Sequence, residues 1–123
     1  MILVEKTNEN EFSDSEKTIA SLGLDEFEEK VLKDSNPVLV LCMRHDPEFK
    51  EQISSIKDIC TNYVGRLKVY LLGDEALRTF RESFAVKGTP TFLLFMNGIE
   101  KGRLLGQVDS TDLNDFLSRM LQL

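Results

Sequence analysis

The stretch Gly88-Thr89-Pro90-Thr91-Phe92-Leu93-Leu94-Phe95-Met96-Asn97-Gly98 decides the fold of this chain. Its middle, residues 91–96, is a nearly continuous apolar run that is typical of a buried strand. Asn97-Gly98 is a strong signal for a tight hairpin, so an antiparallel strand is expected over residues 99–105. A proline loop leading into a hairpin is therefore predicted for this part of the chain.

Upstream of this hairpin, two further runs predict strands. Val38-Leu39-Val40-Leu41-Cys42 is apolar throughout, which favours a central strand covered on both faces. Residues 67–72 form the second candidate. A short apolar stretch over residues 18–22 precedes both runs. The chain therefore supplies a mixed sheet of four or five strands.

Helical spacing of apolar residues separates these strands. Residues 25–27 open one helix, with Phe27, Val31 and Leu24 as its buried stripe. Residues 46–48 (Asp-Pro-Glu) begin a second helix, because Asp is a good N-cap and Pro is favoured at the first helical position. The buried positions expected in the later helices are Ile53, Ile56, Cys60 and Tyr63, then Leu77, Phe80 and Phe84, then Leu113, Phe116, Leu117, Met120 and Leu121 after an Asp109-Ser110 cap.

The resulting order is β-α-β-α-β-α-β-β-α, which predicts an α/β fold with helices on both faces of the sheet. Residues 1–17 are interpreted as a polar, acidic N-terminal extension, and residues 18–123 as the folded domain. The formal net charge of −6 argues against a nucleic-acid partner. No segment approaches the roughly 20 apolar residues that span a bilayer, so no membrane association and a cytoplasmic location are expected.

Several separated features now agree with one known family. Gly88-Thr89-Pro90-Thr91, the hairpin at Asn97-Gly98, Pro37 before the central strand and Gly106 after the hairpin stand in the same register as in thioredoxins. From about residue 18 to the end, the chain resembles the thioredoxin family. The resemblance implies a thioredoxin-like fold with a cis peptide bond at Pro90. It also implies that Thr89 presents its main chain to extended peptides.

The chemistry of that family is carried by Cys-x-x-Cys at the start of the second helix, where the helix N-terminus stabilises a thiolate. In this register, Asp46 and Phe49 occupy the two former Cys-x-x-Cys positions, and neither can form a mixed disulfide. His45 replaces the tryptophan that usually precedes the motif. Val40 stands where the family has a buried aspartate, and the lysine that pairs with it falls at Leu71. The resemblance therefore implies a redox-inactive member.

The chain has two cysteines, Cys42 and Cys60, and both are interpreted as reduced and buried. Cys42 ends the central strand near the former active site, so a weak monothiol oxidoreductase is the alternative. That activity requires an exposed thiol with a lowered pKa, which Arg44 and His45 could favour. Cys42-x-x-His45 has metal-ligand spacing, but His45 is the only histidine and two ligands do not complete a tetrahedral site. We expect no metal and no cofactor.

The function expected from these observations is a non-catalytic module, not an enzyme, that binds a protein or extended peptide in the former substrate groove. The residues assigned to this groove are Arg44, His45, Asp46, Phe49, Thr89, Pro90 and Gly106. Redox-silent thioredoxin-like domains include chaperones, scaffolds and assembly factors, and the analogy extends to this chain. A third interpretation is that Phe49 closes the groove and that partners bind the acidic extension or the outer face of a helix.

Overall fold

The computed structural model of this chain describes residues 19–44, 49–63 and 65–121, without the side chains of Phe49 and Cys60. Its strands are β1 (Ala20–Leu22), β2 (Val38–Cys42), β3 (Lys68–Leu72), β4 (Thr91–Met96) and β5 (Ile99–Leu105). Its helices are α3 (Leu24–Phe27), which continues into the π-helical turn η1 (Glu28–Leu32), then α4 (Phe49–Asn62), α5 (Asp74–Ser83) and α6 (Ser110–Leu121). This order confirms the predicted alternation of strands and helices.

The strands form one five-stranded mixed sheet in the order β1-β3-β2-β4-β5. β1 and β2 both pair with β3 in parallel, as the helical crossovers between them require. β4 pairs antiparallel with β2 and with β5. The hairpin at Asn97-Gly98 is therefore confirmed, and so is the mixed sheet of the predicted α/β fold.

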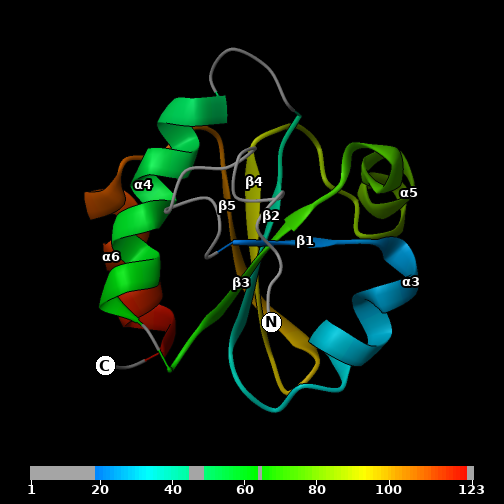
Figure 1. Ribbon diagram of the computed structural model, residues 1–123, viewed down its shortest axis with the longest axis horizontal. Coiled ribbons are helices and arrows are strands. Elements are labelled where there is room, and N and C mark those ends of the chain that lie inside the picture. Colours follow the sequence, from blue (N-terminus) through cyan, green and yellow to red (C-terminus); the bar gives the residue numbers. More distant parts are fainter. Residues whose placement is uncertain (1–18, 45–48, 64, 122–123) are drawn as a thin grey trace, which may run out of the picture.

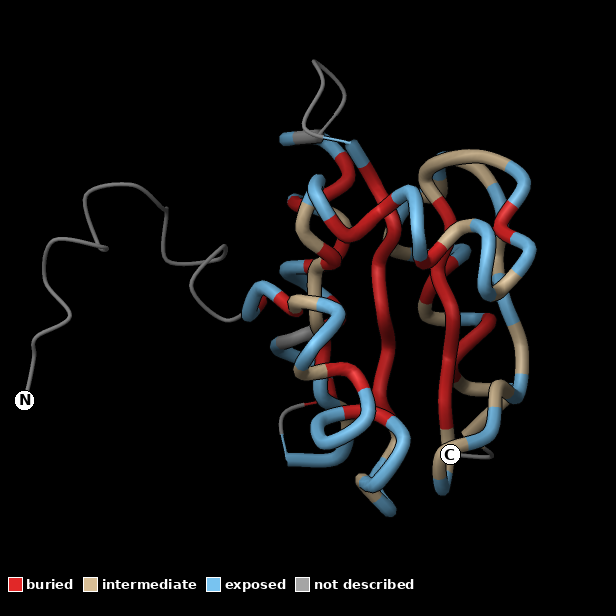
Figure 2. The backbone as a smooth tube through the Cα atoms, turned by 90° about the vertical axis from the view of Figure 1, so that its right-hand side faces the viewer, coloured by how far each residue is buried: buried red, intermediate tan, exposed pale blue. Residues whose placement is uncertain are grey.

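Helices cover both faces of the sheet (Figure 1): α4 and α6 lie on one side, and α3, η1 and α5 lie on the other. All five residues of β2 are buried, because this central strand has a helical layer on each face. Figure 2 shows long buried stretches running through the middle of the molecule, and the longest buried runs of the sheet are those of β2 and β4. The apolar run at residues 38–42 is thus a central strand covered on both faces, as predicted.

The first helical segment differs from the prediction in one residue. Phe27 and Val31 are buried, but Leu24 is 39% exposed. The segment changes from α3 to η1 at Glu28, and a π-helical turn is wider than an α-helical turn. Phe27 and Val31 therefore share the buried face, whereas Leu24 falls outside it.

The last helix follows its predicted pattern. The Asp109 carboxylate accepts a hydrogen bond from the Asp112 N–H (2.8 Å), and the Asp109 carbonyl accepts one from the Leu113 N–H (3.1 Å). Asp109 is therefore the N-cap. Leu113, Phe116 and Leu117 are buried against the sheet, whereas Met120 and Leu121, which were also expected to be buried, are only half-buried. None of the helices in the described ranges is long and apolar enough to cross a membrane.

Candidate functional site

β2 and β5 end, and β4 begins, on the same side of the sheet, which is called the edge from here on. The predicted groove residues lie just beyond these strand ends. Cys42 at the end of β2 pairs with Thr91 at the start of β4, and Thr91 pairs with Leu105 at the end of β5. The segments just beyond this row are Met43–Arg44, Thr89–Pro90 and Gly106. The sheet therefore places the three predicted walls of the groove at the same edge.

Hydrogen bonds fix the segment around the proline. The Gly106 N–H donates to the Pro90 carbonyl over 2.8 Å, and the Thr91 hydroxyl donates to the Gly88 carbonyl over 2.6 Å. The Thr89–Pro90 peptide bond is cis in this arrangement. Thr89 and Pro90 are both half-buried, so part of each faces solvent.

Gly106 is required by its backbone conformation and not by crowding. Its φ is +101°, in the region that residues with a Cβ rarely adopt. A Cβ built at this position would meet no atom within 4 Å. The glycine thus lets the chain turn away from β5 while its N–H bonds the proline segment.

The other wall is described in part. Arg44 follows β2 and is exposed. His45 and Asp46 lie outside the described residues. Phe49 begins α4, and its side chain lies outside the described part as well. The structure therefore places Arg44, Thr89, Pro90 and Gly106 at one edge of the sheet and leaves the remaining groove residues as predictions.

Cys42 does not meet the requirements of a reactive thiol. It is fully buried in the core between the sheet and α5. Burial raises its pKa to about 12, although the positive charges of Arg103 and Arg81 oppose that shift. The thiol is therefore protonated at neutral pH and shielded from solvent, contrary to the two conditions for monothiol catalysis.

The register of β2 and β3 places Val40 and Leu71, which the resemblance assigns to the buried aspartate and lysine of the family, on opposite faces of the sheet. Val40 pairs with Tyr70, and both pack in the core on the α5 side of the sheet. Leu71, the predicted position, packs in the core on the α4 side. Successive side chains of a strand point to opposite faces, so a shift of one residue changes the face. Tyr70 is the residue beside Val40, and neither is a carboxylate or an ammonium.

Sequence reasoning missed Gln52, a buried polar residue beside the groove. Gln52 is only 1% exposed, and its side chain amide bonds the Val108 main chain twice. Its Nε2 donates to the Val108 carbonyl (2.9 Å), and its Oε1 accepts from the Val108 N–H (3.2 Å). Because Val108 follows Gly106 by two positions, Gln52 holds the third wall of the predicted groove to α4.

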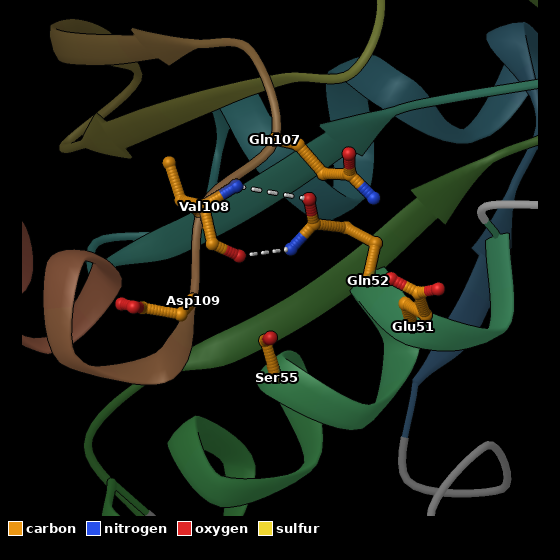
Figure 3. Close-up of a pocket in the computed structure, with 6 residues that line it drawn as sticks. All are labelled: Glu51, Gln52, Ser55, Gln107, Val108 and Asp109. Carbon is orange, nitrogen blue, oxygen red and sulfur yellow. Dashed lines mark hydrogen bonds between the residues drawn. The ribbon is translucent and has the colours of Figure 1, made fainter.

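Figure 3 shows the two hydrogen bonds between Gln52 and Val108 in a shallow pocket of about 300 Å³ between α4 and the loop that precedes α6. The pocket is lined by Glu51, Gln52, Ser55, Gln107, Val108 and Asp109. The burial of Gln52 could have been predicted from the sequence, because residues 52, 56, 59 and 63 follow helical spacing. A glutamine on such a buried stripe needs a hydrogen-bond partner. The stripe predicted through Ile53, Ile56, Cys60 and Tyr63 overlooked it and also overlooked the buried Ile59. Within the described ranges, no three potential metal ligands cluster.

The fold and this edge of the sheet place the chain in a class of α/β proteins. In this class, a proline loop lies beside the end of the central strand. The family model for thioredoxin matches residues 18–119, and the chain belongs to the thioredoxin family. It is 32% identical to a thioredoxin of Acidithiobacillus ferridurans over 98 residues, which are 79% of this chain and 91% of that protein. It is 27% identical to the chloroplastic thioredoxin M2 of Arabidopsis thaliana over 99 residues, 74% of this chain. The match spans half the length of the plant protein.

Proposed function

We propose that this chain is a non-catalytic member of the thioredoxin family that binds extended protein segments at the edge formed by Arg44, Thr89–Pro90 and Gly106. The observation that carries the proposal is the state of Cys42, which is fully buried and has a pKa of about 12. The sequence also has Asp46 and Phe49 at the former cysteine positions. A protein with these residues lacks the dithiol of the family mechanism.

The main chain at Thr89 supports recognition of an extended segment. Among the described residues, none hydrogen-bonds to the main chain of Thr89. An extended peptide pairs with such groups in the way that an added strand pairs with the edge of a sheet. Leu105 supplies an apolar surface next to them: it is 61% exposed, and its Cδ1 lies 3.9 Å from where a Cβ on Gly88 would stand.

The competing function is a thiol oxidoreductase, because both relatives named above are called thioredoxins. In this chain such activity would depend on Cys42 as a single thiol. A nucleophilic thiol needs solvent access and a lowered pKa, whereas burial raises the pKa of Cys42. The position of Cys42 therefore favours the binding function over the redox function.

The test is a selection of random extended peptides against the immobilised full-length chain, followed by titration of the best peptide by NMR. We expect the amide signals of Gly88, Thr91 and Gly106 to shift on binding. Thr89→Arg should weaken the affinity at least tenfold, which corresponds to about 1.4 kcal/mol. Equal melting temperatures of the two proteins would exclude a folding defect.

Thr61→Arg is the matched control. It makes the same substitution at an exposed position of α4, twelve residues or about 18 Å along the helix from Phe49. Thr61→Arg should bind the peptide as wild type does. Equal affinity of Thr89→Arg and Thr61→Arg would reject the proposed surface. Catalysed reduction of insulin by dithiothreitol that is lost in Cys42→Ser would instead establish the oxidoreductase.

A further inference from the structure

One arginine on the edge strand joins β5 to the segment that follows α5. Arg103 donates two hydrogen bonds to the Glu100 carboxylate, from Nε at 2.6 Å and from Nη2 at 2.8 Å. The same guanidinium donates to the main chain carbonyls of Phe84 (2.9 Å) and Ala85 (3.3 Å). Arg103 is therefore a bridge between two segments that are far apart in the sequence.

This bridge depends on an irregularity in the hairpin. Leu94 pairs with Gly102, but Phe95 pairs with Glu100, so Lys101 is an extra residue in β5. In a regular strand, residues three positions apart point to opposite faces of the sheet. The extra residue brings Glu100 to the face on which Arg103 lies, where the two side chains form their ion pair.

The carbonyls that Arg103 binds lie where α5 ends. Phe84 is the C-cap of α5, and Ala85 adopts a positive φ of 54°. A cation near the last carbonyls of a helix is favourable, because these groups lack partners within the helix. Val86 then returns to the core, and its N–H bonds the Arg81 carbonyl over 2.9 Å. Only three positions separate Val86 from Thr89.

The segment 86–90, here called the proline loop, is thus held at both ends. At its C-terminal end, the Gly88 and Pro90 carbonyls accept hydrogen bonds from Thr91 and Gly106. At its N-terminal end, the chain is held by the carbonyls that Arg103 binds and by the Val86 amide. The side chain of Arg103 is 34% exposed, so it can be replaced without leaving a hole in the core.

We propose that Arg103, oriented by Glu100, is a positioning residue for the peptide-binding edge. It holds the corner at Phe84 and Ala85, and through that corner it sets the position at which Thr89 presents its main chain. Arg103 does not contact the peptide. This inference rests on the proposed function, because its second readout is the affinity for a peptide bound beside Thr89.

The test compares Arg103→Gln with Arg78→Gln. Arg78 is the matched control, because it is an exposed arginine of α5 whose guanidinium pairs with Glu82 at 3.6 Å. Amide hydrogen exchange by NMR reports local opening separately from global unfolding. In Arg103→Gln we expect the Val86 amide to exchange at least about tenfold faster, whereas the amides of β2 keep their wild-type rates.

The affinity for the selected peptide should fall about tenfold in Arg103→Gln and stay unchanged in Arg78→Gln. Arg103→Lys keeps the positive charge but lacks the forked geometry of the guanidinium, so its affinity should fall between those of wild type and Arg103→Gln. An unchanged Val86 rate would overturn the proposal. So would equal acceleration of the Val86 and β2 amides, which indicates global destabilisation, or faster Val86 exchange with unchanged affinity.

Failure of the proposed function is recognised separately, in proteins that retain Arg103. If wild type binds no selected peptide, or if Thr89→Arg binds it unchanged, the binding edge is wrong and the assigned role of Arg103 fails with it. If wild type binds and Thr89→Arg does not, the edge stands, and Arg103→Gln decides the positioning role alone.

Discussion

Replacing Gln52 by methionine removes two hydrogen bonds while nearly preserving the volume of the side chain. Gln52 is buried in α4, and its amide is the partner of both the N–H and the carbonyl of Val108. A hydrogen bond contributes about 1 kcal/mol net, and a buried group left without a partner costs about 1–3 kcal/mol. Val108 is only half-buried, so water can reach part of its main chain.

Two lost bonds at about 1 kcal/mol each predict that Gln52→Met lowers the free energy of unfolding by about 2 kcal/mol. For a domain of this size, that loss lowers the melting temperature by roughly 6–8 °C. Urea unfolding followed by circular dichroism should show a lower midpoint with an unchanged slope, because the surface exposed on unfolding is the same.

Ser55→Ala is the control for this measurement, since Ser55 lines the same pocket and is half-buried. It should change the free energy of unfolding by less than about 0.5 kcal/mol. If Gln52→Met also stays within about 0.5 kcal/mol of wild type, the two bonds to Val108 do not hold the loop after Gly106, and the reasoning is refuted.

Three further predictions concern single sites. Cys42 should resist iodoacetamide at pH 8 in the folded protein and react after unfolding, because burial raises its pKa to about 12. Mass spectrometry of the peptide that contains Cys42 measures the labelling, and a labelled Cys42 in the folded protein would contradict this prediction. Gly106→Ala should lower the free energy of unfolding by about 1–2 kcal/mol in a urea titration, because its φ of +101° disfavours a Cβ, and an unchanged midpoint would contradict this cause. Hydrogen bonds from Lys68 and from the Asn36 N–H lower the pKa of Asp34 in the folded protein. The ionised Asp34 therefore stabilises the fold at pH values above the unfolded pKa of about 3.9, and this stabilisation is lost as the pH falls through the folded pKa. Lys68→Met should therefore cost more stability at pH 7 than at pH 3, and an equal cost at both pH values would exclude this coupling.

The hairpin was the most predictable part of the fold. Its strands were predicted over residues 91–96 and 99–105, and β4 and β5 have these bounds. Asn97 has a φ of 53° and Gly98 a φ of 78°, which is the conformation that a two-residue turn demands and that few other pairs adopt. Local residue chemistry thus fixed the turn, and the turn fixed the pairing of its two strands.

The features that sequence reasoning missed depend on the register between distant segments. The register of β2 and β3 puts Val40 and Leu71 on opposite faces of the sheet, because Val40 pairs with Tyr70. The bulge at Lys101 has a similar effect, because it puts Glu100 and Arg103 on one face. No periodicity within one strand specifies such offsets, since the partner strand determines them.

The candidate site was predictable to the extent that strand ends determine it. Once β2, β4 and β5 are aligned, Arg44, Thr89–Pro90 and Gly106 must lie at the same edge of the sheet. The side chains that support this edge were not predictable in the same way. Arg103 binds carbonyls 18 and 19 positions away, and Gln52 binds a residue 56 positions away. Only the folded chain brings these groups within hydrogen-bond distance.

The hydrogen bonds around the proline loop show which groups hold the proposed binding edge in place, and whether any of them belongs to the former cysteine positions. In the described part of the chain, the loop and its neighbours are held by the side chains of Thr91, Arg103 and Gln52 and by the N–H of Gly106. None of these groups belongs to the former cysteine positions, and none of the bonds involves Cys42. If the chain lacks the family reaction, as the proposed function states, having Asp46 and Phe49 at the two former cysteine positions therefore leaves these supports in place. The hydrogen bonds that hold this edge are thus independent of the former cysteine positions, so the residues found at those positions do not argue against binding.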